Sequence, residues 1–231
     1  GVHLWNNKPL GWVGITPGPT MAAADIFTVR IIGKGGHGAM PHETVDPVVA
    51  AAQIVSSLQT IVGRNVPPTK TAVVTVAAIH GGEAFNVIPS QVDIKGTLRA
   101  FDPDVRQLVI ERFNAIVHSI AQGMGCQATI KIESLTPALV NDPQVAAHVQ
   151  NIVRRILPDC NLETDYQVMG SEDMAFFLQE TPGCFILVGS ANVEKGLDAS
   201  HHHPRFDFDE RALPIAAAII AEAAAEYLST G

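Results

Sequence analysis

Histidine is the residue type in this sequence with the clearest capacity for chemistry. The 231-residue chain contains nine histidines, which is about twice ordinary usage, and several lie in loops rich in Gly, Pro and charge, where binding groups are common. The run 201–203, before Pro204, has three interpretations: a tag remnant, a solvated loop or a loop that carries a metal ligand. Its internal position and its length of three residues disfavour a tag.

Three further histidines have both a structural and a functional interpretation. His3 lies beside Leu4 and Trp5, so a packed histidine is the simpler interpretation and a ligand is the alternative. His37 and His42 flank a glycine turn, in which a tightly bent backbone could present imidazoles. A plain turn explains that pattern equally well, so residue types alone do not decide between the two.

The composition excludes several classes of partner. Lys and Arg number 15 against 23 Asp and Glu, a net charge of −8, so no broad basic surface is available for nucleic acid or an anionic membrane. The most apolar run, residues 215–225, falls short of a bilayer span and predicts a buried helix. Three widely spaced cysteines disfavour a disulfide framework and predict a cytoplasmic protein.

Residues 20–135 carry a doubled strand-helix-strand pattern. Alternating β-branched stretches predict strands over residues 26–32, 71–79, 91–101 and 128–132. Asp46-Pro47 and Asp102-Pro103 each supply an N-cap and a proline at the first helical position, and apolar residues at helical spacing follow both. Two such units in succession predict an α+β domain of ferredoxin-like type, with helices on one face of a four-stranded antiparallel sheet.

Residues 1–19 and 136–231 are predicted to be two parts of one α/β domain that holds this insertion. Asp142-Pro143 begins a third helix, Phe185–Val188 predicts a strand, and a final helix is expected from about residue 209 to 228. The chain begins without an initiator Met, a basic segment or an apolar signal segment. We therefore expect it to be part of a longer protein.

Several motifs occur in one order along the chain and together resemble a known family. They are Gly1–Trp5, Gly33–His42, Ala84–Pro89, Gly96–Phe101, Met169–Asp173 and His202–Glu210. This set resembles the aminoacylase, hippurate hydrolase and auxin-conjugate hydrolase family of dinuclear-metal, peptidase-like amidohydrolases, and the resemblance covers essentially the whole chain. It implies a partial catalytic domain of the two-metal peptidase type and an inserted lid or dimerisation domain.

The resemblance also implies roles for individual residues. His3 matches a metal-ligand histidine in a Gly-x-His-x-Trp segment, and His202 matches the distal metal ligand before Pro-Arg-Phe-Asp-Phe. His203 is the alternative if the register of the triple histidine slips by one. His37 matches a lid histidine that, in dimeric members, reaches the partner subunit's site and stabilises the oxyanion.

Three further residues are assigned to substrate binding by the same resemblance. Asn86 and Arg99 match lid residues that hold the carboxylate of the substrate's amino acid. Glu172 lies where the family usually has Gly-Gly-Glu-Asp, and Ser171 is the departure from that pattern. The residue types suit these roles, because Arg can grip a carboxylate through two hydrogen bonds and Asn can add a neutral one.

The implied activity is hydrolysis of the amide bond of an N-acyl or N-aroyl amino acid, with two divalent metal ions (Zn, Mn or Co) as cofactors. Neutral imidazoles bind such metals, which lower the pKa of a bound water. The family's Cys-x-His ligand pair, its bridging acid and its Glu-Glu pair with the general base lie upstream of Gly1–Trp5, and no Cys-x-His occurs here. We therefore expect the chain alone to be inactive.

A function of another class is kept as the alternative. The chain could be a non-catalytic module that dimerises through residues 20–135 or binds a carboxylate ligand. In either case the expected assembly is a homodimer, because the edge of an inserted sheet is a natural place for a second copy to pair.

Overall fold

The computed structural model describes residues 1–229, which form two compact units. The inserted unit comprises Ala22–Ala138 together with Met169–Ser171, and the flanking unit comprises Gly1–Met21, Leu139–Val168 and the residues from Glu172 onward. The sequence placed the boundaries of the insertion at residues 20 and 135, so the edges differ by a few residues. Met169–Ser171 join the inserted unit, where Ala22 N donates to Gly170 O at 2.9 Å.

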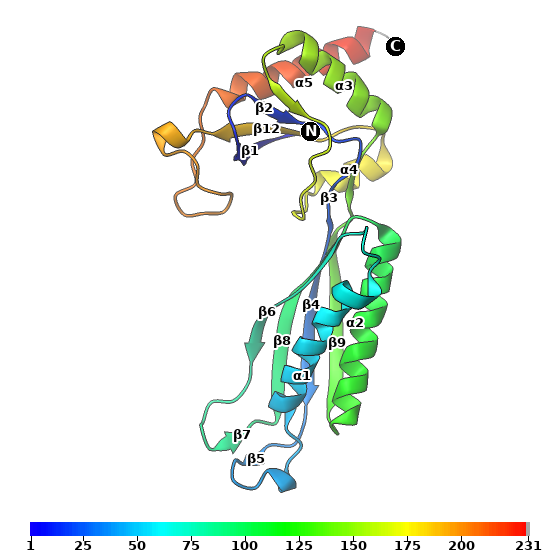
Figure 1. The fold of residues 1–231 in the computed structure, drawn as a ribbon, viewed down its shortest axis with the longest axis vertical. Helices are drawn as coiled ribbons and strands as arrows, with labels where there is room; N and C mark the ends of the chain where they lie inside the picture. The colour runs from blue at the N-terminus through cyan, green and yellow to red at the C-terminus, as the bar shows by residue number, and fades with distance from the viewer. Residues whose placement is uncertain (230–231) are drawn as a thin grey trace. The chain divides into compact units, whose positions relative to one another are not determined.

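The inserted unit is a four-stranded sheet with two helices on one face (Figure 1). The strand order is β6-β8-β4-β9 and every neighbouring pair is antiparallel. This is the ferredoxin-like arrangement that the doubled pattern predicts, and that prediction is confirmed. Its elements are β4 (Ala23–Ile32), α1 (Pro47–Thr60), η2 (Ile61–Asn65), β6 (Ala72–His80), β8 (Gln91–Ala100), α2 (Pro103–Gly123) and β9 (Gln127–Thr136).

Both helices of the inserted unit begin as their Asp-Pro pairs predict. The Asp46 side chain accepts from the N–H groups of Val48 and Val49, and Asp102 does the same for the residues two and three positions after it. Every second residue of β4 then faces the helices. Phe27 of that set is 2% exposed, and its ring lies 4.5 Å from that of Phe113 on α2. The core therefore lies between the sheet and the two helices.

A small two-stranded ribbon extends one end of this sheet. β5 (Gly36–His37) pairs with β7 (Val87–Ile88), and η1 (Pro41–Glu43) follows β5. The ribbon lies at the end where Ile32 of β4 pairs with Gln91 of β8, as Figure 1 shows. Ala23 and Ala100 pair at the opposite end of the same two strands.

The flanking unit is built on a mixed four-stranded sheet of order β1-β12-β2-β11. β1 pairs parallel with β12, β12 antiparallel with β2, and β2 parallel with β11. A mixed sheet with helices confirms the predicted α/β class. The elements are β1 (Val2–Pro9), β2 (Trp12–Gly14), β3 (Gly18–Met21), β10 (Leu139–Asn141), α3 (Pro143–Ile156), β11 (Asn161–Glu163), α4 (Met174–Glu180), β12 (Ile186–Ala191), η3 (Val193–Lys195) and α5 (Ala212–Ser229).

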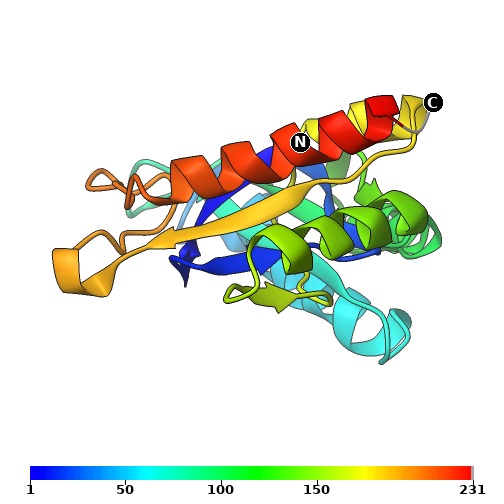
Figure 2. The same ribbon diagram turned by 90° about the horizontal axis from the view of Figure 1, so that it is seen from above.

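Helix α5 runs alongside β12, as its orange-to-red ribbon shows in Figure 2. Its residues Ala212, Ala216 and Ile219 are buried in the core of the flanking unit. By length and composition α5 could cross a membrane. A single helix of this kind is weak support for a membrane span, since core helices can be equally long and apolar. The sequence predicts a buried helix over residues 215–225. Only 17% of α5 is buried, so that prediction is correct for one face of the helix alone.

Gly96 is required where β8 crosses the core, and its replacement tests the packing of the inserted unit. A Cβ there would lie 1.9 Å from Thr75 O and 2.4 Å from Cζ of Phe27. We expect Gly96→Ala to lower the free energy of unfolding of this unit by about 3 kcal/mol, because the backbone oxygen cannot move aside cheaply.

The measurement is amide hydrogen exchange in β4 and β8, since Trp5 and Trp12, the two tryptophans, lie in the flanking unit. Gly63→Ala is the matched control, because a Cβ at Gly63 meets nothing within 4 Å. It should leave the exchange unchanged or slightly slower. Equal exchange in the two variants would contradict the packing described for β8.

Candidate functional site

The loop that carries the histidine run is fastened to β1 and β12 by a buried asparagine. The Asn6 side chain is 3% exposed, and its Nδ2 donates to Ala199 O at 2.8 Å and to Asp207 O at 3.0 Å. Its Oδ1 accepts from Ser190 Oγ at 3.0 Å, and its backbone N–H donates to His201 Nε2 at 3.1 Å. One residue of β1 thus holds the first and last parts of the loop.

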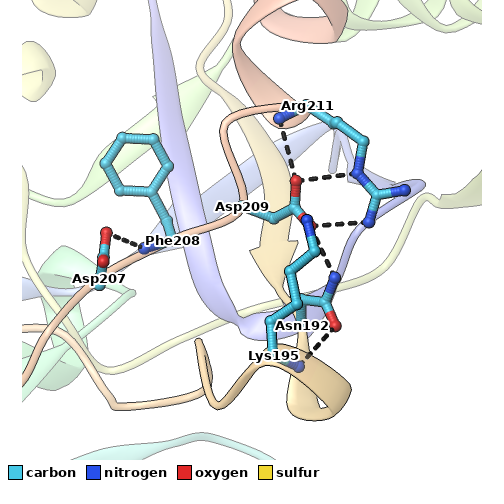
Figure 3. Close-up of polar contacts among 6 residues, drawn as sticks. All are labelled: Asn192, Lys195, Asp207, Phe208, Asp209 and Arg211. Carbon is cyan, nitrogen blue, oxygen red and sulfur yellow. Dashed lines mark hydrogen bonds and ion pairs between the residues drawn. The ribbon is translucent and has the colours of Figure 1, made fainter.

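Asp209 closes the same loop at the entry to α5 (Figure 3). Its backbone N–H donates to Ser190 O at 2.9 Å. Its carboxylate accepts from Arg211 Nε and Nη2 at 2.9 and 2.7 Å, from Asn192 Nδ2 at 2.6 Å, and pairs with Lys195 Nζ at 3.3 Å. The hydrogen bonds from Arg211, and then that from Asn192, hold the pKa of Asp209 well below its usual value.

His3 is oriented by its own strand so that one ring nitrogen stays free. Its Nδ1 lies 2.5 Å from Leu4 O. Because a carbonyl can only accept, Nδ1 carries the proton and Nε2 presents a lone pair. A histidine whose second nitrogen donates to a backbone carbonyl has the tautomer that metal-binding histidines commonly adopt.

His201 lies against His3 but is not available as a ligand. The two ring centroids are 5.1 Å apart and nearly perpendicular, and His201 also packs on Trp5 at 4.9 Å and Phe206 at 5.2 Å. Its Nε2 accepts from the N–H of Asn6, so its remaining proton is on Nδ1 and no lone pair is free. Burial lowers the pKa of His201, and the neighbouring His3 lowers it further. The neutral ring positions the loop.

His202 and His203 differ in whether their ring nitrogens are engaged in hydrogen bonds. His203 Nδ1 accepts from the N–H of Arg205 at 3.1 Å. His202 is exposed, has a left-handed backbone with φ 64°, and its ring has no hydrogen-bond partner within residues 1–229. A left-handed φ is rare for a residue other than Gly, and such strained backbone is common at functional sites. Of this run, His202 has both ring nitrogens unengaged.

Glu172 lies close to His3 in the flanking unit. Burial raises the pKa of Glu172, and a hydrogen bond with Asp173 raises it further. His3, Glu172 and the histidine loop are thus gathered in the flanking unit. Within residues 1–229, however, no group of three or more His, Cys, Asp or Glu side chains is arranged to hold a metal ion.

In the inserted unit the structure brings His37 and Asn86 together on the two-stranded ribbon. The N–H of Gly38 donates to Asn86 O at 2.8 Å. His37 Nδ1 accepts from the N–H of Ala39 at 3.0 Å, so Nε2 carries the proton. His37 is exposed and therefore offers solvent a fixed N–H donor.

Arg99 lies at the opposite end of the sheet from that ribbon. It is eight residues along β8 from Gln91, which corresponds to about 26 Å. Its Nε donates to Thr97 Oγ1 at 3.2 Å, and its Nη1 is buried without a hydrogen-bond partner in the described part of the chain. Asn86 and Arg99, predicted to hold the same carboxylate, are therefore far apart within one chain.

The residues that anchor the loop were not predicted as site residues. Asn6 and Ser190 lie in ordinary strand segments, and their bonds to residues 199–209 depend on the pairing of β1 with β12. Asp209 lies inside the Phe-Asp-Phe-Asp-Glu segment of a quoted motif. That motif was the one signal that could have drawn attention to it.

The same chain matches known proteins over nearly all of its length. Residues 1–226 match the family described as Peptidase family M20/M25/M40. The chain belongs to this M20 peptidase family. The prediction of its family from the sequence motifs is confirmed.

The chain spans only part of the length of its relatives in the M20 family. The chain is 36% identical to N-acetylcysteine deacetylase of Bacillus subtilis (strain 168) over 100% of its length and 59% of that protein. It is 38% identical to IAA-amino acid hydrolase ILR1-like 4 of Arabidopsis thaliana, covering 99% of this chain and 53% of that one. The chain thus spans little more than half of either relative.

The YXEP protein of Bacillus subtilis, described as a dinuclear metal binding peptidase from the M20 family, has a similar structure. The TM-score is 0.78 at 32% sequence identity, over 100% of this chain and 57% of that one. The shared fold agrees with the mixed sheet and the inserted four-stranded sheet described above.

The pH dependence of stability tests the role of Asp209. Its pKa is depressed in the folded state from an ordinary value of 3.8, so its stabilising contribution is present above about pH 4 and is lost as the pH falls below it. We expect Asp209→Asn to unfold at lower urea concentration than the wild type at pH 7, with a smaller difference at pH 3.

Tryptophan fluorescence during urea unfolding is the measurement, because Trp5 and Trp12 both report on the flanking unit. Asp207→Asn is the control, since Asp207 is exposed and its carboxylate accepts only from the N–H of Phe208, at 2.8 Å, among the described residues. A difference between wild type and Asp209→Asn that is equal at both pH values would rule out the carboxylate as the stabilising group.

Proposed function

We propose that this chain is part of a metal-dependent amidohydrolase that cleaves the amide bond of N-acyl or N-aroyl amino acids. The observation that carries the proposal is the fixed tautomer of His3, whose free Nε2 lies in the same unit as Glu172 and the unengaged His202. Support also comes from relatives whose names describe a deacetylase and an amino acid conjugate hydrolase.

The cofactors we propose are two divalent metal ions of Zn, Mn or Co type, with His3 and His202 as ligands from this chain. The residues present do not by themselves complete a metal site. We propose that the remaining ligands and the general base belong to the part of the longer relatives that this chain does not span, and that the chain alone is inactive. When bound, such metals polarise a carbonyl and activate water.

The inserted unit supplies the groups proposed to act on the substrate. His37 Nε2–H is an oriented donor suited to an oxyanion, and its ring is held by the N–H of Ala39. Arg99, anchored through Nε, keeps Nη1 for a carboxylate. The Asn86 amide can add a neutral hydrogen bond to the same carboxylate.

The separation within the sheet supports a homodimer. Arg99 lies about 26 Å along β8 from Gln91, and the ribbon with His37 and Asn86 lies at the Gln91 end of the sheet, so one chain cannot direct both at one small substrate. We propose that two copies associate through residues 20–135 and that each site receives His37 and Asn86 from the partner subunit. We also propose a cytoplasmic location, which the three free cysteines support.

A second candidate function is a non-catalytic module that binds a carboxylate. The unpartnered Nη1 of Arg99 favours it, because that group needs no metal to bind an anion. Turnover of an N-acyl amino acid by the longer protein would favour the amidohydrolase. Binding of the carboxylate without turnover would favour the non-catalytic module.

Metal titration tests the ligand assignment in the chain itself. Isothermal titration with Zn²⁺, Mn²⁺ or Co²⁺ should show weak binding that His3→Ala and His202→Ala each reduce at least about tenfold, because each removes a free imidazole lone pair. His203→Ala is the matched control and should bind as the wild type does. Loss of binding in His203→Ala with retention in His202→Ala would move the ligand to the neighbouring position.

Release of free amino acid from N-acetyl and N-benzoyl amino acids tests the catalytic roles. The 231-residue chain should show no turnover, and a chain extended to the length of its relatives should be active. In the extended enzyme, His37→Ala should lower kcat by about 100-fold, because it removes a donor used in the transition state. Arg99→Gln should mainly raise KM, because the clamp holds ground state and transition state alike.

His42→Ala is the control in this assay, since His42 is an exposed histidine on the same ribbon loop. It should leave both constants near those of the wild type. Robust turnover by the 231-residue chain would contradict the proposal that ligands and base lie elsewhere.

A further inference from the structure

Three residues form one row across the inserted sheet at the end far from the ribbon. Arg99 of β8 pairs with Ala24 of β4, and Ala24 pairs with Thr136 of β9. Residues paired in this way point to the same face of a sheet. Because Phe27 and its alternate neighbours face the helices, this row lies on the face opposite α1 and α2.

The row contains both of the buried polar side-chain atoms that lack a hydrogen-bond partner in the described residues. They are Arg99 Nη1 and Thr136 Oγ1. Buried polar groups in native proteins are nearly always paired, and an unpaired one destabilises the fold. Two such atoms on one row of one face therefore indicate a shared ligand rather than two unrelated defects.

Two hydrogen bonds in series tie Arg99 to β4, the strand that lies between Arg99 and Thr136. Arg99 Nε donates to Thr97 Oγ1, and that hydroxyl donates to Asp25 O on β4 at 2.8 Å. Through Thr97 the Arg99 guanidinium is thus linked to β4, which lies between β8 and β9 in the sheet. Val73, its neighbour on β6, is apolar and offers no acceptor.

We propose that Thr136 is a second carboxylate-binding residue, whose hydroxyl donates to the same substrate carboxylate that Arg99 Nη1 binds. Ala24 between them carries only a methyl group and leaves the two donors as the polar groups of the row. A carboxylate has two oxygens and can accept one bond from each donor. This inference rests on the proposed function, in which Arg99 holds the carboxylate of the amino acid.

The test is binding of N-acetylglycine to the 231-residue chain, with the dissociation constant measured by NMR chemical-shift titration. Thr136→Val removes the hydroxyl at nearly constant shape and should raise the dissociation constant about tenfold, as loss of a hydrogen bond to a charged group does. Thr136→Ser keeps the hydroxyl and should bind within about twofold of the wild type. N-acetylglycinamide, which has no charge, should bind wild type and Thr136→Val equally weakly.

Thermal unfolding without ligand separates binding from a structural role. Thr136→Val should melt at the same temperature as the wild type or higher, because it removes an unpaired buried hydroxyl. Thr129→Val, an exposed position on the same strand, is the control and should leave both affinity and melting unchanged. A lower melting temperature for Thr136→Val with unchanged affinity would overturn the inference and make the hydroxyl structural.

Arg99→Gln distinguishes this inference from the proposed function. If Arg99→Gln abolishes binding while Thr136→Val binds as the wild type does, Arg99 remains the clamp and Thr136 is not part of it. If N-acetylglycine binds Arg99→Gln and wild type alike, or does not bind the wild type, both the clamp and the inference are overturned.

Discussion

The hydrogen bonds of the Asn6 side chain are the interaction on which the candidate site in the flanking unit depends. Asn6 is buried on β1, and it meets Ser190 of β12 because the two strands pair in parallel. Through Ala199 and Asp207 it also fixes the two limbs of the histidine loop. Without the Asn6 side chain, the buried Ser190 hydroxyl would lose its acceptor, and the carbonyls of Ala199 and Asp207 would lose the donor that ties the loop to β1.

Backbone groups, rather than other side chains, set the protonation pattern of the histidines. Leu4 O fixes the proton of His3 on Nδ1, and the N–H groups of Asn6 and Ala39 fix those of His201 and His37. The result is a division of labour among similar residues. His3 presents a lone pair, His37 presents an N–H, and His201 has no free lone pair and positions the loop.

The inserted unit could be predicted from the sequence more fully than the site could. Its strand and helix patterns are local, and both Asp-Pro pairs signal helix starts that the structure shows. The histidine loop is different, because its shape depends on contacts between residues about 190 positions apart. Residue types at positions 201–203 do not reveal which ring is already bonded to Asn6 or to the N–H of Arg205.

The alignment of Arg99 and Thr136 in one row could not be predicted from the sequence either, since it depends on the register between strands. A bulge in β9 between the partners of Ala24 and Asp25 places Thr136, and not Leu135, opposite Ala24. Arg99 could be proposed from its motif, whereas nothing in the sequence near Thr136 marks a binding group.

The length of β8 has a consequence for how this protein can vary. Adding or deleting one residue between Gln91 and Arg99 would turn Arg99 toward α1 and α2, where an arginine would have to enter an apolar core. A change of two residues would keep the face but move the guanidinium by about 6.6 Å along the strand. Insertions are therefore tolerable in the turns that bound this sheet, while the strand between them can exchange side chains but cannot change its length.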